Sequence, residues 1–262
     1  MQLKIEIFVL THKKFYESYD PSLYIPLLNG ACSLADDFGY VRDDTGENIS
    51  DLNKYFAEFT GQFWAWKNSN ADIIGFCHYR RWFVRNLKFD KLTKQDIIHD
   101  LEECDIILPQ KRRLLDKVSN VIQDSLKVNP NYGVKCEDYM ILGETIKNHF
   151  PDYYESFKKV MDSKEAYYNT MFIANKELAD EYFNWLFNIF KFVFDEIDFS
   201  KYPEDNQRVL GFFGEILLNV FILKNNLKIK EHYILFSDRK FPLIDVLSRR
   251  FPRLISIESL LG

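Results

Sequence analysis

The chain has 262 residues, 47% of them hydrophobic, and a formal net charge of −5. This length and composition suit one α/β domain with an appended helical part, and the negative charge argues against a general nucleic-acid-binding protein. The four cysteines have no paired spacing, so free thiols in a reducing cytoplasm are expected rather than a disulfide framework.

The first predicted element is a strand over residues 3–10, where apolar residues alternate and then run without interruption. Thr11 and His12 follow it directly. Ligands of open α/β sheets bind beyond the carboxyl ends of the strands, so these two side chains are candidates to contact a nucleotide base or ribose. Residues 13–50 lack periodicity and are rich in Asp, Gly, Pro and Asn, which predicts one long loop.

A helix is predicted next, over residues 51–67, with Ser50 as its N-cap. Its apolar residues fall at helical spacing on one face, which is typical of a helix packed on a core. A strand over residues 72–79 follows. Its continuous apolar run predicts burial on both faces, as in a parallel sheet.

This strand ends in His78-Tyr79-Arg80-Arg81, the most informative stretch of the chain. A guanidinium can grip two phosphate oxygens, so two arginines beside an aromatic ring and an imidazole indicate a phosphorylated ligand. If the strand continues through this stretch, only one arginine faces that ligand, and we favour Arg80 over Arg81. The alternatives are a solvated basic turn, an arginine that only pairs with a neighbouring carboxylate, and a structural role for His78.

The rest of the chain alternates strand and helix and then becomes more helical. Thr93 and Asp96 form a capping pair that begins a predicted helix, and a short strand ends at Pro109. Further helices are predicted over 138–150, 153–161, 176–194 and 207–224, and further strands over 166–173 and 228–236. This order predicts an α/β fold with a mostly parallel central sheet, crossover helices and no sharp domain boundary.

The helix over residues 207–224 carries the strongest candidate for a catalytic base. Helical spacing places Arg208 and Glu215 on one side, beside Gly211 and Gly214. Two glycines cost a helix roughly 2 kcal/mol relative to alanine, which indicates close approach of a ligand or a backbone. A carboxylate on a mostly apolar helix needs a partner or a chemical role, so Glu215 is the first candidate for a general base. A structural bond to Arg208 or to backbone is the alternative.

Other residues are candidates because of their type and position. Asp138 begins a predicted helix and is a second candidate base, with a helix-start charge as its alternative role. Asn169 precedes the apolar run Met171-Phe172-Ile173 and is a candidate to bind sugar hydroxyls. The polar segment around Gly46 suits a polyhydroxyl sugar, with a solvated turn as the alternative. Its candidate residues are Asp43, Asp44, Thr45 and Asn48.

Taken in order, these motifs resemble a bacterial galactofuranosyltransferase family of capsule, exopolysaccharide and O-antigen synthesis, formerly catalogued as a domain of unknown function. Each motif alone is weak, but their order is specific, and the resemblance spans roughly residues 3 to 225. The segments that carry it are Thr11-His12-Lys13, DDTGENIS at 43–50, HYRR at 78–81, DIILP at 105–109, YNTMFI at 168–173 and RVLGFFGE at 208–215.

The resemblance implies a GT-A-like fold that binds a nucleotide sugar, in a single domain over residues 1–262. The half up to about residue 110 would bind the nucleotide, and the more helical half from about residue 111 would bind the acceptor. The resemblance also implies transfer of galactofuranose from UDP-galactofuranose onto a lipid-linked surface glycan, with inversion of the anomeric centre. The alternatives are another UDP-sugar donor, or a non-catalytic module that binds a nucleotide sugar or a glycan.

No Asp-x-Asp motif follows an apolar strand, although many enzymes of this fold hold a divalent metal on such a motif. Arg80 and Arg81 are therefore expected to neutralise the leaving diphosphate. No cofactor is expected, and the alternative is a metal such as Mn²⁺ or Mg²⁺.

The location of the protein is expected to be cytoplasmic, because no signal peptide is evident and no apolar run is long enough to span a bilayer. A basic and apolar mixture near the C-terminus predicts peripheral contact with the inner face of the membrane, with core packing as the alternative. The residues of this mixture are Leu247, Arg249, Arg250, Phe251, Arg253 and Leu254.

Overall fold

The computed structural model describes residues 3–128 and 133–238, so the basic and apolar segment near the C-terminus lies outside the described residues. An eight-stranded sheet forms the centre of the molecule, and a two-stranded ribbon, β7 with β8, lies apart from it. The strands are β1 Ile5–Thr11, β2 Tyr24–Leu28, β3 Val41–Arg42, β4 Ile73–His78, β5 Arg81–Val84, β6 Ile106–Pro109, β7 Arg112–Arg113, β8 Glu165–Ala166, β9 Phe172–Asn175 and β10 Ile229–Phe236.

The sheet is mixed, which corrects the expectation of a mostly parallel one. Strand β1 pairs in parallel with β2 and β4, but β5 and β9 run antiparallel to their neighbours. The order is β3-β2-β1-β4-β5-β10-β6-β9, and an additional β4–β9 pairing closes the last five strands into a ring. The chain reverses directly after β4, and this reversal brings β5 back along β4 and makes the ring closure feasible.

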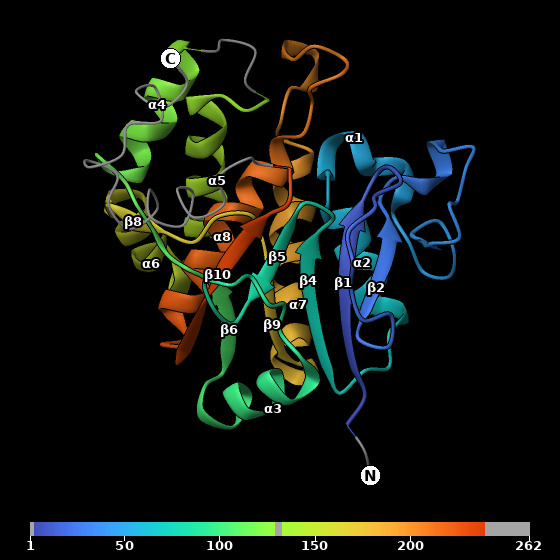
Figure 1. Cartoon of the computed structure of the whole chain (residues 1–262). Helices are drawn as coiled ribbons and strands as arrows, with labels where there is room; N and C mark the ends of the chain where they lie inside the picture. Colours follow the sequence, from blue (N-terminus) through green and yellow to red (C-terminus); the bar gives the residue numbers. More distant parts are fainter. Residues whose placement is uncertain (1–2, 129–132, 239–262) are drawn as a thin grey trace, which may run out of the picture.

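Helices cover the sheet on both sides and at its ends. The α-helices are α1 Asn53–Phe56, α2 Phe59–Asn68, α3 Lys94–Glu103, α4 Val118–Val128, α5 Cys136–His149, α6 Pro151–Asp162, α7 Lys176–Phe194 and α8 Val209–Lys224. Short 3₁₀ turns cover Ala31–Ser33, Ser50–Leu52 and Phe199–Lys201. In Figure 1, α1 and α3 lie at opposite ends of the central strands, and α4 to α6 lie beyond β10.

The N-terminal half differs from the sequence-based expectation at two places. The loop predicted over residues 13–50 contains β2 and β3, whose short runs interrupt polar segments and so have no clear period. The helix predicted over 51–67 is broken, because Ala57 between α1 and α2 has a φ of 51° and a ψ of −128°. Ser50 is not a helix cap, since its hydroxyl instead donates to Asp43 Oδ1 at 2.5 Å.

The C-terminal half follows the helical pattern more closely. Helix α7 has the predicted bounds, and the predicted capping box of Thr93 with Asp96 begins α3. The strand predicted over 166–173 is divided into β8 and β9 by the segment that contains Asn169 and Thr170. Among the described residues, no helix is long and apolar enough to cross a membrane.

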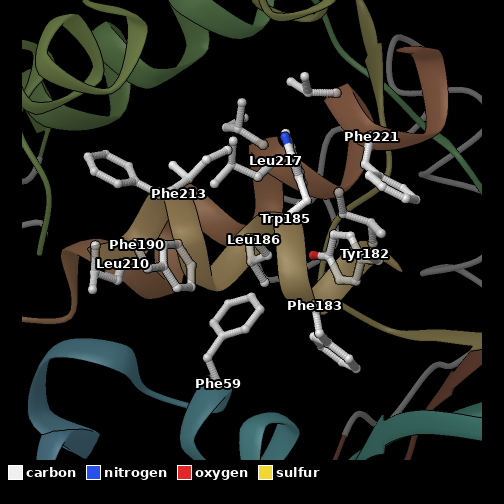
Figure 2. Close-up of a cluster of buried hydrophobic side chains, with 14 of the residues drawn as sticks. Phe59, Tyr182, Phe183, Trp185, Leu186, Phe190, Leu210, Phe213, Leu217 and Phe221 are labelled. Atoms are coloured by element: carbon white, nitrogen blue, oxygen red, sulfur yellow. The ribbon is translucent and has the colours of Figure 1, made fainter. Parts of the chain in front are cut away.

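The two glycines of α8 are explained by the packing of this helix against α1 and α2. A methyl group added to Gly214 would lie 2.0 Å from the ring of Phe59, and one added to Gly211 would lie 3.1 Å from Cβ of Ala57. Figure 2 shows Phe59 directed toward Phe190 in the buried aromatic cluster between α7 and α8. Full burial of a phenylalanine stabilises the fold by about 1.5–3 kcal/mol. This contact fixes the part of α8 that precedes Glu215.

Candidate active site

A cleft of about 560 Å³ opens at the carboxyl ends of β1, β2 and β4 and is closed on its other side by α8 and the α1–α2 break. This is the position at which open α/β sheets bind ligands. Its lining residues are Leu10, Thr11, His12, Asn29, Asn53, Lys54, Ala57, Glu58, His78, Tyr79, Arg80, Arg81, Glu204, Asp205, Arg208, Gly211, Phe212 and Glu215. The cleft therefore brings together the predicted residues from β1, the HYRR stretch and α8.

One end of the cleft combines aromatic rings with cations. The rings of His12 and Tyr79 meet edge to face at 5.5 Å, and Lys13 and Arg80 lie 5.3 and 5.8 Å from the Tyr79 ring centre. Burial lowers the pKa of His12, and the nearby positive charges lower it further, so its ring is neutral at pH 7. The Thr11 hydroxyl is bonded to Lys13 backbone atoms, which shapes this turn. Aromatic rings beside cations suit a nucleotide.

Both arginines of the HYRR stretch line the cleft, because the strand does not continue through them. Strand β4 ends at His78, the chain turns at Tyr79 and Arg80, and Arg81 begins β5 opposite His78. The Arg80 side chain is 44% exposed and lies 3.4 Å from an Asp238 oxygen. The structure therefore removes the choice between the two arginines that a continuing strand would impose.

Arg81 is the more buried of the two arginines. Its Nε is buried and has no hydrogen-bond partner among the described residues. Burial lowers the pKa of Arg81, as does the charge of Arg80, while the carboxylates of Glu215 and Glu58 oppose this shift. A guanidinium stays charged under these conditions, so the cleft holds a poorly satisfied buried cation.

Glu215 lies where the cleft meets the segment between β8 and β9. The backbone N–H of Asn169 donates to Glu215 Oε1 at 3.1 Å, and His78 Nε2 lies 2.8 Å from the Asn169 carbonyl. Burial, followed by the charge of Arg81, lowers the pKa of His78 to about 4, so this ring is neutral and donates through Nε2. Burial raises the pKa of Glu215 to about 7, and the charge of Glu58 raises it as well. A carboxyl with this pKa can exchange a proton near neutral pH.

The Asn169–Thr170 segment has a strained backbone. The φ angles are 80° and 50°, and positive φ is rare for a β-branched residue such as threonine. Such conformations cost about 1–3 kcal/mol each and persist only where the surroundings hold them. Here Thr170 Oγ1 donates to Glu58 Oε1 at 2.9 Å, and Gln62 Nε2 donates to the Thr170 carbonyl at 3.0 Å. Asn169 Nδ2 is buried without a hydrogen-bond partner among the described residues.

Helix α8 and the residue before it complete this region. Arg208 lines the cleft, and its guanidinium lies 5.4 Å from the ring of Phe212. Of the two structural bonds that were the alternative role of Glu215, the structure shows the one to backbone, from the Asn169 N–H, and places Arg208 beside Phe212. Asn219 exchanges two hydrogen bonds of 2.8 Å with the backbone of Tyr167, and so anchors the segment that leads to Asn169.

The polar motif around Gly46 lies outside the cleft lining. Asp43 is fully buried, and its carboxylate accepts from the N–H groups of Gly30 and Ala31 at 2.9 Å each. This bonding holds the turn after β2, from which Asn29 reaches the cleft. Asp44, Thr45 and Asn48 are engaged within the motif or with Arg42 and Trp64. Asp43 therefore positions the turn that carries Asn29, and direct contact of these four residues with a sugar stays a prediction without geometric support.

Asp138 also lies outside the cleft lining. It is buried at the start of α5, where its carboxylate accepts from the Lys135 N–H at 2.6 Å and from the Tyr202 hydroxyl. Burial raises the pKa of Asp138, and these hydrogen bonds oppose the rise. This geometry corresponds to the helix-start role that was its alternative. Glu215 is thus the predicted base that the structure brings to the cleft.

Several lining residues were not predicted from sequence, and Glu58 is the foremost of them. It lies within a segment that reads as one continuous helix, and alanine at position 57 gives no signal of the break that aims Glu58 into the cleft. Among the described residues, no group of three or more His, Cys, Asp or Glu side chains is arranged to hold a metal ion.

Comparisons with known proteins identify the family of this chain and a structure of similar fold. The family model described as Domain of unknown function (DUF4422) matches residues 6–226. The chain is similar to the apo structure of the bifunctional glycosyltransferase WbbM, with a TM-score of 0.80 and 26% sequence identity. The match covers 90% of this chain and 46% of that chain, so this chain spans less than half the length of WbbM. No curated protein matches the chain.

Proposed function

Because this chain belongs to the family Domain of unknown function (DUF4422), we propose that it shares the activity of the glycosyltransferase that its fold matches. The observation that carries the proposal is one cleft that holds both cations and a candidate base. Arg80 and Arg81 line it together with Glu215, a carboxyl with a pKa of about 7. Glycosyl transfer from a nucleotide sugar requires stabilisation of a leaving diphosphate and a base for the acceptor.

The donor in this proposal is a UDP-sugar. The rings of His12 and Tyr79 face the base or ribose, and Arg80 and Arg81 bind the diphosphate oxygens. A phosphate oxygen would satisfy the Arg81 Nε, which is buried without a partner among the described residues. Charge-assisted bonds of this kind are about twice as strong as neutral ones. The galactofuranose identity of the sugar rests on the motif resemblance alone.

The acceptor in this proposal presents a hydroxyl group to Glu215. Its oxygen forms a bond to the anomeric carbon, while the bond from that carbon to the diphosphate oxygen breaks and its electron pair leaves with UDP. The hydroxyl proton passes to the Glu215 carboxylate. Attack on the face opposite the leaving group inverts the anomeric centre, with no covalent enzyme intermediate. A lipid-linked surface glycan is the acceptor class that the motif resemblance implies.

Binding and transfer with a panel of donors test this proposal. UDP-galactofuranose, UDP-galactopyranose and UDP-glucose are titrated by calorimetry, and each is then assayed with a synthetic lipid-linked acceptor. We expect one UDP-sugar to bind and to be transferred. Binding without transfer to any acceptor would favour the non-catalytic module, and the absence of binding by every UDP-sugar would contradict the proposal.

A further inference from the structure

Glu58 is a second carboxylate in the cleft, and the proposed reaction gives it no task. It follows Ala57 in the break between α1 and α2 and is partly buried. Its Oε1 accepts from the Thr170 hydroxyl at 2.9 Å. Its Oε2 would lie 4.0 Å from a methyl group added to Gly211. The side chain is therefore directed at α8, at the level of the helical turn that precedes Glu215.

Segments of strained backbone hold both Glu58 and Glu215 in place at the cleft. Ala57, with a φ of 51° and a ψ of −128°, adopts a conformation that glycine favours, and it immediately precedes Glu58. Asn169 and Thr170 have positive φ as well; the first binds Glu215 through its N–H, and the second binds Glu58 through its hydroxyl. Strain of this kind clusters at active sites, where it fixes a functional geometry.

From this arrangement we infer that Glu58 is a positioning residue for Glu215. The Asn169–Thr170 segment holds the two carboxylates facing the same cleft, where the charge of Glu58 keeps Glu215 a strong enough base for the acceptor hydroxyl. The inference rests on the proposed function, since the base acts only if a sugar is transferred.

The charged groups near Glu215 come from several elements. Glu58 projects from the α1–α2 break, Arg81 belongs to β5, Arg112 lies on β7, and Arg208 precedes α8, while His78 at the end of β4 is neutral. Burial and the charge of Glu58 raise the pKa of Glu215, whereas the Asn169 N–H, Arg81 and Arg112 lower it. The cleft is also lined by Glu204 and Asp205, but Glu58 is the carboxylate whose charge raises the pKa of Glu215.

A purely structural role of Glu58 would be to stabilise the start of α2. An acidic side chain near a helix N-terminus interacts favourably with the helix dipole. However, the Glu58 side chain forms no cap hydrogen bond with α2 and reaches Thr170 instead, more than a hundred residues away in sequence. The two roles predict different effects on Glu215, so they can be separated by titration.

The test compares Glu58→Gln with Glu196→Gln, which removes an exposed carboxylate after α7. Glutamine at 58 can still accept from Thr170, so the hydrogen bond is kept and the charge is lost. We expect ¹³C NMR to show Glu215 titrating near pH 7 in the unmodified protein and in Glu196→Gln. In Glu58→Gln the midpoint should fall by about one pH unit or more. The acid limb of kcat/KM should move by the same amount, with the KM for the donor little changed.

An unchanged Glu215 midpoint in folded Glu58→Gln would overturn the inference, and so would loss of UDP-sugar binding without a shift of that midpoint. If Glu58→Gln does not fold, Glu58→Asp retracts the charge by one methylene and should give a smaller downward shift; no shift would again overturn it. If the Glu215 midpoint shifts in Glu58→Gln but the unmodified protein transfers no sugar, the proposed function is refuted and the pairing of the two carboxylates stands. If the unmodified protein transfers a sugar but the Glu215 midpoint does not shift in Glu58→Gln, the pairing is refuted and the proposed function stands.

Discussion

Replacing Glu215 by glutamine should stabilise the folded protein above neutral pH. In the unmodified protein, the pKa of the Glu215 carboxyl rises from 4.5 to about 7 on folding. The folded state therefore keeps a proton that the unfolded chain loses, so the free energy of unfolding falls as pH rises from about 4.5 to about 7. At 1.36 kcal/mol per pKa unit, the full penalty above pH 7 is about 3 kcal/mol. Glutamine has no such penalty, and its carbonyl can still accept from the Asn169 N–H.

Urea unfolding of both proteins at pH 4.5 and pH 8 measures this penalty. The free energy of unfolding of Glu215→Gln should exceed that of the unmodified protein by little at pH 4.5 and by about 3 kcal/mol at pH 8. Glu196→Gln serves as the control, because it removes an exposed carboxylate. Equal stability of Glu215→Gln and the unmodified protein at pH 8 would refute the reasoning, as would a stabilisation that does not change with pH.

Three further predictions concern the cleft and its supports. Arg80→Ala should weaken UDP binding about tenfold or more, as loss of a charge-assisted bond does, and transfer should survive excess chelator; activity lost on chelation and restored by Mn²⁺ would contradict this. Gly214→Ala should lower the urea midpoint, because its methyl would lie 2.0 Å from the Phe59 ring and overpacking costs about 1–3 kcal/mol; an unchanged midpoint would contradict it. Asp43→Asn should destabilise by about 1–3 kcal/mol by leaving a buried N–H unpaired, whereas the more exposed Asp44→Asn should cost less.

The helices and the central strands could be predicted because their residues face one consistent environment. Helix α7 packs along its length on a single core, so its apolar period is continuous and both predicted bounds are correct. Strand β4 is buried on both faces and shows an unbroken apolar run. Glu215 could be recognised from sequence because a carboxyl is unusual in an otherwise buried helix next to two glycines.

The remaining features depend on contacts between distant parts of the chain. Ala57 breaks a helix although alanine is the best helix former, because contact with α8 at Gly211 and the bonding around Glu58 fix that turn. The reversal after His78 depends on β10, which pairs with β5 and lies about 150 residues later. The positive φ angles of Asn169 and Thr170 are likewise set by their tertiary partners. No local pattern of residue types carries this information.

The single-turnover rate of sugar transfer by Glu215→Gln tests the central claim most directly. The measurement uses rapid quench with a saturating UDP-sugar and a synthetic lipid-linked acceptor, so that donor binding and product release do not limit the rate. Our account predicts a transfer rate about 10²–10⁴-fold below that of the unmodified protein, with donor affinity nearly unchanged. A near-normal transfer rate in Glu215→Gln, with Asp138→Asn inactive, would contradict the assignment of Glu215 as the base.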